Sequence, residues 1–224
     1  MEMYRSGHNE VHSKCIYQET DTGVRIPPSP PKNVFKITVI GCSEQIKGEK
    51  MSIVKSFDGN MIDVGDCMGC AKAQAKEDTK INSGKILRTK NFDVSQDFEL
   101  PINGFIVIGS LRHIESINEM TVDEKQELII LIDIVISSLK KINVCSQYNV
   151  VWEEKDGNHF HVWLVPRHSY LRDIIGTNIM KKIGELFDYA KKNLRTDENI
   201  NEIYTTIKKL QEELKNNKTI QELL

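Results

Sequence analysis

The amino-acid sequence predicts a fold that mixes β-strands with α-helices. Short runs of β-branched or alternating apolar residues are typical of strands, among them residues 104–108 and 159–166. A long stretch after Thr121 carries apolar residues at helical spacing, which indicates a helix with one buried face. The chain has 224 residues, of which 39% are hydrophobic, so it is long enough to bury a core.

The chain begins with a polar segment. Residues 1–33 end in a proline-rich stretch, and proline fixes φ and lacks a backbone N–H. We therefore expect a flexible N-terminal arm. Residues 34–40 alternate and are β-branched, which predicts the first strand, and residues 92–94 predict another.

Two local sequence signals predict a helix start and a β-hairpin in the middle of the chain. Thr121 and Glu124 stand three residues apart at the start of the helix, and this spacing predicts a capping box. Further on, Asp156-Gly157 separates the strand-like runs 149–153 and 159–166, which predicts a hairpin, because glycine tolerates positive φ. We expect the main domain to cover residues 34–172.

The remaining residues, 173–224, predict a C-terminal helical extension. Its amphipathic pattern is interrupted between Asn193 and Asn199. The apolar stripe of this extension is expected to pack on the domain or on a second subunit.

Charge and cysteine content narrow the class of protein. The 30 Lys and Arg residues against 32 Asp and Glu give a net charge of −2, which excludes a polycation built for nucleic acid. Five cysteines are an odd number, which argues against a fully paired secreted framework. No apolar run is long enough to cross a bilayer. We therefore expect a soluble, cytoplasmic protein with no membrane and no nucleic-acid partner.

Cys67 and Cys70 form a C-x-x-C motif, with Gly69 between the thiols. From a tight turn, this spacing lets both sulfurs reach one tetrahedral metal ion. A redox pair or two incidental cysteines are the alternatives. No βαβ unit surrounds the motif, which makes a thioredoxin-like site the weaker interpretation.

Two histidines stand on one face of the predicted strand 159–166. Because alternate residues of a strand share a face, His159, His161 and Trp163 point one way and their neighbours point into the core. An accidental exposed pair is the alternative. His113 follows the strand 104–108 and alone would be a surface residue, but with a strand histidine it would complete a site of two cysteines and two histidines.

Residues 96–108, 112–117 and 159–167, in this order around the capped helix, resemble the histidine triad (HIT) superfamily. The resemblance covers about residues 66–168. Within the superfamily the chain is similar to diadenosine tetraphosphate hydrolases and to galactose-1-phosphate uridylyltransferases. The resemblance implies an α+β fold with an antiparallel sheet and a long helix, a homodimer, and a small-molecule nucleotide as ligand.

The resemblance also implies roles for single residues. His161 would be the nucleophile that attacks an α-phosphate and carries a covalent nucleotidyl group. A structural zinc ion would be held by Cys67, Cys70, His113 and His159. The third triad position, which is His or Gln in the superfamily, is Trp163, whose indole offers only one N–H donor.

Two functions follow from this pattern. The first is a nucleotide phosphoanhydride hydrolase or nucleotidyltransferase. The second is a nucleotide-binding sensor or adaptor without turnover, in which Trp163 stacks on the ligand.

Three further residues are candidates for substrate binding. Asp97 stands where superfamily members contact the ribose, although a solvated loop carboxylate is the alternative. Asn158 precedes His159 and would bond a phosphate oxygen, although asparagine is common in turns. Arg167 would pair with phosphate, and a salt bridge elsewhere is the alternative.

Overall fold

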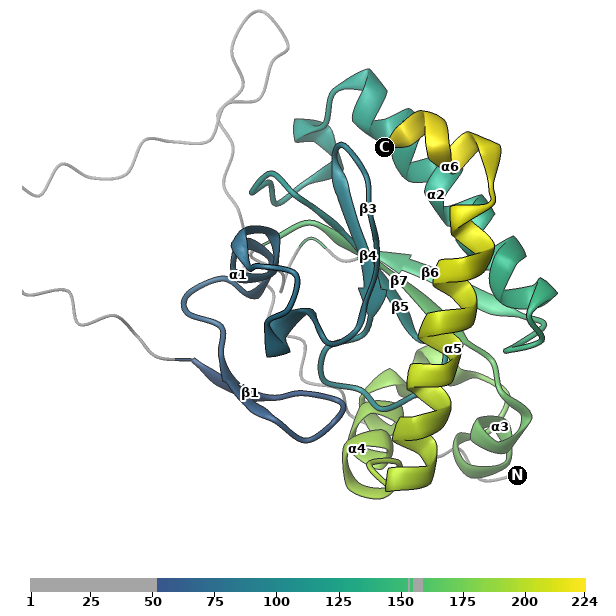
Figure 1. Cartoon of the computed structure of the whole chain (residues 1–224). Coiled ribbons are helices and arrows are strands. Elements are labelled where there is room, and N and C mark those ends of the chain that lie inside the picture. The colour runs from purple at the N-terminus through teal and green to yellow at the C-terminus, as the bar shows by residue number, and fades with distance from the viewer. Residues whose placement is uncertain (1–51, 153, 155–158) are drawn as a thin grey trace, which may run out of the picture. The chain divides into compact units, whose positions relative to one another are not determined.

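The structure is a computed structural model that describes residues 52–152, 154 and 159–224. These residues form an α+β fold, in which helices pack on a five-stranded antiparallel sheet (Figure 1). The fold class predicted from the sequence is confirmed. The predicted arm of residues 1–33, the strand 34–40 and the turn at Asp156-Gly157 lie outside the described residues.

The sheet has the order β3-β4-β5-β7-β6, and every neighbouring pair is antiparallel. Its strands are β3 (Lys85–Arg88), β4 (Phe92–Gln96), β5 (Ile106–Ser110), β6 (Tyr148–Trp152) and β7 (His161–Pro166). The four predicted strands in this part of the chain are therefore present, with ends shifted by one or two residues. Strand β3 has only four residues and ends in charges, so its sequence shows no strand pattern.

Helix α2 (Val122–Lys141) begins with the predicted capping box. The backbone N–H of Glu124 donates to Thr121 Oγ1 over 3.2 Å, and the N–H of Thr121 donates to Glu124 Oε2 over 2.7 Å. Two of the four free N–H groups of the first turn are satisfied in this way. Along the helix, Leu128, Leu131 and Val135 form the buried face.

One face of the sheet carries the main core. Helices α2, α5 (Asp197–Lys215) and α6 (Lys218–Leu223) contribute to it (Figure 1). The buried sheet side chains in this core are Ile86, Phe92, Val94, Ile106, Ile108, Val162 and Leu164. Burying an aliphatic or aromatic side chain contributes about 1.5–3 kcal/mol. The C-terminal helices therefore stabilise the same core as the sheet.

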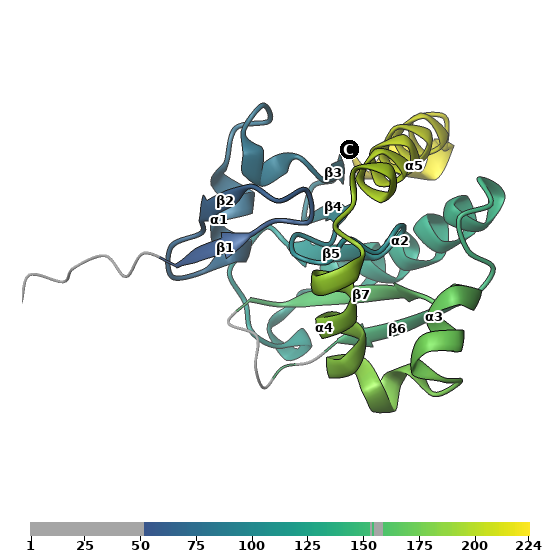
Figure 2. The same ribbon diagram turned by 90° about the horizontal axis from the view of Figure 1, so that it is seen from below.

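The opposite face is covered in two places. Near β7, helix α4 (Ile183–Asn193) packs on Trp163 and Val165, and Figure 2 shows this helix crossing close to β7. Helix α1 (Met68–Gln74) lies beside the small hairpin of β1 (Ile53–Lys55) and β2 (Met61–Asp63). Between the two helices, part of the sheet face stays open as a cavity.

The C-terminal part is helical, as predicted. Helix α3 (Ser169–Ile175) precedes α4, and the predicted domain boundary at residue 173 falls inside α3. Helix α4 ends at Asn193 and α5 begins at Asp197, which confirms the predicted break. Short 3₁₀ helices cover Lys80–Asn82, Ile117–Glu119 and Ile179–Lys182. Within the described residues, no helix combines the length and apolarity that a membrane crossing requires.

Candidate metal centre and active site

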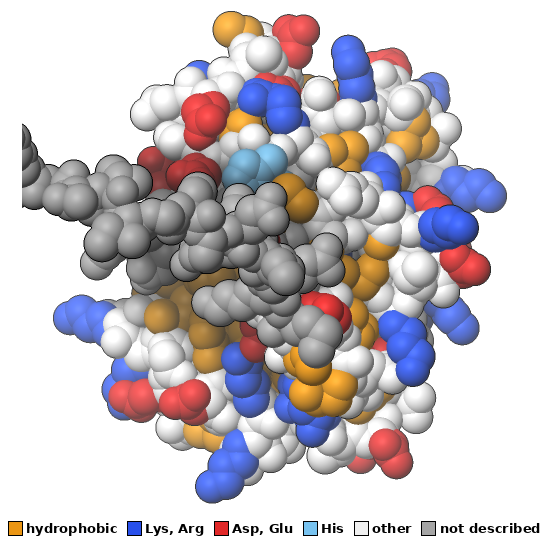
Figure 3. Space-filling model, turned by 90° about the vertical axis from the view of Figure 1, so that its left-hand side faces the viewer, with side chains coloured by type: hydrophobic (Ala, Val, Ile, Leu, Met, Phe, Trp, Pro, Cys, Tyr) orange, Lys and Arg blue, Asp and Glu red, His pale blue; other side chains and the backbone are white. Residues whose placement is uncertain are grey.

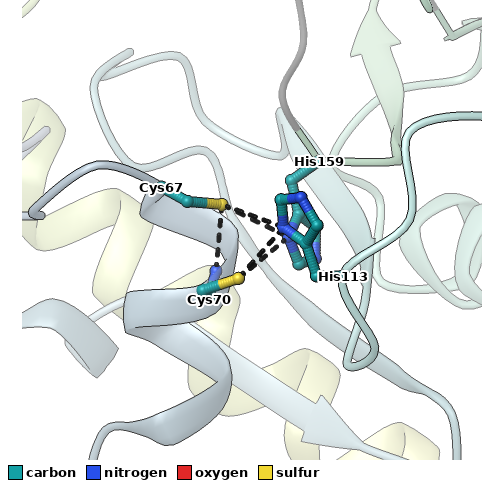
Figure 4. A group of neighbouring side chains, drawn as sticks. All are labelled: Cys67, Cys70, His113 and His159. Carbon is teal, nitrogen blue, oxygen red and sulfur yellow. Dashed lines mark hydrogen bonds between the residues drawn. The ribbon is translucent and has the colours of Figure 1, made fainter.

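The four predicted metal ligands lie together. The ligand atoms of Cys67, Cys70, His113 and His159 are all within 4.8 Å of one another (Figure 4). The four distances from a cysteine Sγ to a histidine Nδ1 are between 3.2 and 3.6 Å. A tetrahedral zinc ion with usual bond lengths separates its sulfur and nitrogen ligands by about 3.5 Å. The donor set and its spacing therefore fit zinc.

The first turn of helix α1 presents both sulfurs. Cys67 is the N-cap of the helix, and its Sγ accepts a hydrogen bond from the N–H of Cys70 over 3.4 Å. Residues three apart in a helix lie on one side, so the two sulfurs face the same point. The C-x-x-C spacing predicts a tight turn here; in the structure the start of helix α1 brings the two sulfurs together instead.

Gly69 allows His159 to approach this helix. A Cβ atom at position 69 would lie only 2.4–2.7 Å from atoms of the His159 ring. On its other side, His159 Nε2 donates to the carbonyl oxygen of Ser110 over 2.6 Å. That bond fixes the tautomer and leaves the Nδ1 lone pair directed at the cysteines. The His159 ring is therefore held between Gly69 of helix α1 and Ser110 at the end of β5.

Burial adjusts the protonation of these ligands. It lowers the pKa of His159 and thereby keeps the imidazole neutral, which is the form that binds metal. Burial and the neighbouring Cys67 raise the pKa of the Cys70 thiol. Two thiolates side by side repel each other, and a divalent cation between them reverses that cost.

His161 lines a cavity of about 410 Å³ on the open sheet face. In the sheet register it pairs with Gly109 of β5, which pairs with Asp93 of β4. Directly paired residues place their side chains on the same face, so these three form one row across the cavity floor. No atom of the described residues lies within 4 Å of a Cβ built on Gly109, so the middle of this row is open.

The His161 ring has a defined orientation. Its Nδ1 donates to the carbonyl oxygen of His159 over 2.8 Å. Because a neutral imidazole carries one N–H, this bond leaves the lone pair on Nε2. The site thus contains a histidine whose free nitrogen suits nucleophilic attack or proton acceptance.

Trp163 stands beside His161, with 5.2 Å between the ring centroids. It contacts two phenylalanines from other parts of the chain. The ring of Phe105 lies 6.3 Å away, and the ring of Phe187 in helix α4 meets Trp163 edge-on at 5.6 Å. These contacts hold the indole at the end of the cavity near α4.

The other predicted residues are placed differently. Asp97 lines the cavity with His161 and Trp163. Arg167 is not among the described residues that line it, and its Nη2 donates to the carbonyl oxygen of Thr177 over 3.4 Å. Asn158 lies outside the described residues.

The cavity also contains a lysine that the sequence analysis did not single out. Lys72 of helix α1 has a side chain only 13% exposed, donates a hydrogen bond to Ser95, and lies 3.9 Å from Asp93 Oδ2. Burial lowers the pKa of Lys72, whereas the charges of Asp93 and Asp97 oppose that shift. Asp93 and Ser95 alternate with apolar residues and give β4 a polar face, a signal in the sequence that marks the cavity floor but not the lysine above it.

Asp97 makes the stability of the protein depend on pH. Burial raises its pKa to about 6, against two hydrogen bonds to Oδ1 from the N–H groups of Glu99 and Leu100. The folded protein therefore holds this proton more tightly than the unfolded chain. The contribution of this proton to the free energy of unfolding is fully present below about pH 3.9. It is lost as the pH rises through about 6.

We expect this group to lower the free energy of unfolding by up to about 3 kcal/mol between pH 4 and pH 7. In Asp97→Asn the amide oxygen still accepts both backbone bonds, but the group has no charge to bury. Urea unfolding of both proteins at pH 4, 5, 6 and 7 measures the difference. Parallel pH profiles for the two proteins would contradict the prediction.

The charge on the surface agrees with the composition. On the face shown in Figure 3, lysine and arginine side chains are scattered and mixed with acidic ones. The described part of this face therefore shows no basic stripe of the kind that follows a nucleic-acid backbone.

No family model matches the chain, and no curated protein matches it. Solved structures are similar to it. A zinc-bound histidine triad family protein from Mycobacterium smegmatis is 13% identical over 66% of this chain and 96% of its own, with a TM-score of 0.44. The Caenorhabditis elegans NitFhit protein is 14% identical over 58% of this chain, with a TM-score of 0.41, and the match spans only 27% of that longer protein.

A third similar structure is a diadenosine triphosphate hydrolase from Plasmodium falciparum. It is 12% identical over 54% of this chain and 97% of its own, with a TM-score of 0.37. The solved structures similar to this chain include a histidine triad family protein.

Proposed function

We propose that this protein is a nucleotide phosphoanhydride hydrolase or nucleotidyltransferase that works through a covalent nucleotidyl group on His161. The supporting observation is the hydrogen bond from His161 Nδ1 to the carbonyl oxygen of His159. It leaves the Nε2 lone pair free in a cavity large enough for a small ligand. The sequence resemblance to the histidine triad superfamily supports the same role.

In the first step, Nε2 of His161 attacks the α-phosphorus. A P–N bond forms, the bond from phosphorus to the bridging oxygen breaks, and its electron pair leaves with that oxygen. In the second step, water or an acceptor hydroxyl attacks phosphorus and gives up a proton to solvent. The P–N bond then breaks, and the lone pair returns to Nε2. Two displacements thus replace one difficult displacement.

Trp163 changes the assistance available to this reaction. Its indole can donate one hydrogen bond but cannot accept a proton. A histidine at this position could exchange a proton with the departing oxygen, whereas the indole offers that oxygen only a hydrogen bond. We expect substrates whose leaving group is already a good one, such as a phosphate chain.

We propose that the metal centre holds a structural zinc ion on Cys67, Cys70, His113 and His159. These four residues would fill all the positions of a tetrahedral ion, so none would be left for an activated water. When bound, the ion supplies the positive charge that keeps both thiolates ionised. Its ligands tie helix α1 to the loop after β5 and to the start of β7, the strand that carries His161.

Trapping the intermediate tests the enzymatic function. The zinc-loaded protein is incubated with a panel of nucleoside triphosphates and dinucleoside polyphosphates, and the reaction is stopped in base, where a phosphoramidate survives. Mass spectrometry should find one nucleotidyl group on His161. Tight binding without an adduct or product for any member of the panel would contradict the proposal.

A second function, nucleotide binding without turnover, is favoured by one observation. Trp163 replaces a residue that can exchange protons, and it is held beside His161 by Phe105 and Phe187. In this case the same panel would bind and no adduct would form. Binding and trapping, measured together, therefore separate the two functions.

A further inference from the structure

The cavity has a second polar group at the side opposite His161. Lys72 and Asp93 both line it there, and Asp93 shares its row of the sheet with His161. Strands β4 and β7 are separated by β5, so the two ends of the row are about 9.6 Å apart. The open floor over Gly109 gives a ligand with its α-phosphate at His161 room to reach Lys72 and Asp93.

Asp93 presents a free acceptor to this space. Its Oδ1 accepts hydrogen bonds from Arg88, over 3.2 Å from Nε and 3.1 Å from Nη2. Its Oδ2 is ion-paired with Lys72 Nζ at 3.9 Å but accepts no hydrogen bond from the residues that the structure describes, and Asp93 is only 6% exposed. A buried polar atom without a hydrogen bond costs free energy, which a ligand donor would recover.

Lys72 presents donors next to that acceptor. One N–H of the ammonium group is used by Ser95, and an ammonium group carries three. The positive charges of Lys72 and Arg88 are balanced by the negative charges of Asp93 and Asp97, so the group as a whole does not attract an anion. It suits a neutral ligand group that offers an acceptor and a donor side by side.

We propose that Lys72 and Asp93 form a subsite for a nucleobase with a ring N–H next to a carbonyl group, as in guanine and uracil. The carbonyl oxygen accepts from Lys72, and the ring N–H donates to Asp93 Oδ2. This inference rests on the proposed function, because it takes the α-phosphate to lie at His161. It makes Lys72 a specificity-determining residue for that reaction.

The charges of the subsite explain the preference. A charged donor is best matched by a strong acceptor, which a carbonyl oxygen is, and a carboxylate is best matched by an acidic N–H. Guanine and uracil place these two groups next to each other. Adenine and cytosine offer instead an amino group beside an unprotonated ring nitrogen, which is a weaker match for both charges.

Binding of nucleoside monophosphates tests the subsite without turnover. The zinc-loaded full-length protein is titrated calorimetrically with GMP, UMP, AMP and CMP. We expect GMP and UMP to bind at least about tenfold more tightly than AMP and CMP. Lys72→Met keeps the length of the side chain but removes its donors, and we expect the preference to fall below about threefold.

Three comparisons control this test. Lys72→Arg keeps the charge and the donors and should retain part of the preference. Lys76→Met removes an exposed lysine four residues further along and should change nothing. Zinc content and thermal unfolding show whether each variant is folded, and the preference of the unmodified protein stands independently of any variant.

The outcomes distinguish this proposal from the proposed function. Equal affinity for the four nucleotides, or no binding of any of them, would overturn the base subsite. So would an equal loss for all four in Lys72→Met, because that result would indicate a contact to the ribose. A base preference without an adduct on His161 supports the subsite and contradicts the enzymatic function. An adduct that forms equally from nucleotides of all four bases supports the enzymatic function and contradicts the subsite.

Discussion

Replacing His161 with alanine is expected to remove the nucleotidyl adduct and to lower turnover by about a thousandfold or more. The substitution takes away the nucleophile. Among the described residues, His159 is then the one remaining histidine that lines the cavity. Both nitrogens of His159 are engaged, by Ser110 on one side and by the cysteines on the other. It therefore has no free lone pair with which to replace His161.

The same variant should keep its zinc and its fold. His161 is not one of the four clustered ligands, so about one zinc ion per chain should remain. Rates are measured by product release, adducts by mass spectrometry and zinc by atomic emission. His168→Ala is the matched control, because His168 does not line the cavity and donates to the carbonyl oxygen of Asn103. An adduct that forms in His161→Ala at the unmodified rate would show that another group is the nucleophile.

The sequence predicts the elements of this fold that have a strong local signal. Helix α2 is predicted from its capping box and its apolar spacing, and β7 from the alternation around His161. The hairpin of β1 and β2 and the strand β3 have three or four residues each. Such strands are too short for a period of two to show, and they are fixed by tertiary pairing.

The candidate site also has residues that the sequence predicts and a residue that it does not. Cys67 and Cys70 are candidates from their C-x-x-C spacing, and His113 is a candidate because two thiolates leave a tetrahedral ion two ligands short. Lys72 is not predictable, since a lysine in a helix is ordinarily solvated. Its burial depends on helix α1 lying over the polar face of β4, which only the packed structure shows.

Loss of one metal ligand should have the largest effect on stability. In His113→Ala we expect the zinc content to fall from about one ion per chain to a small fraction, and the unfolding temperature to drop by about 10 °C or more. His113 is exposed, and a substitution at an exposed position ordinarily changes stability by less than about 0.5 kcal/mol. A large effect at this residue would therefore report the metal and not lost packing.

Cysteine variants give the matched comparison for the same centre. Cys67→Ser should behave as His113→Ala does, whereas Cys145→Ser removes a free thiol outside the cluster and should leave zinc content and unfolding temperature unchanged. A chelator should lower the unfolding temperature of the unmodified protein to that of His113→Ala and should not lower that of His113→Ala further. If metal-free protein unfolds at the same temperature as zinc-loaded protein, the ion does not hold α1 against β7. In that case the clamp of Gly69 and Ser110 on the His159 ring must be sufficient to orient the strand that carries His161.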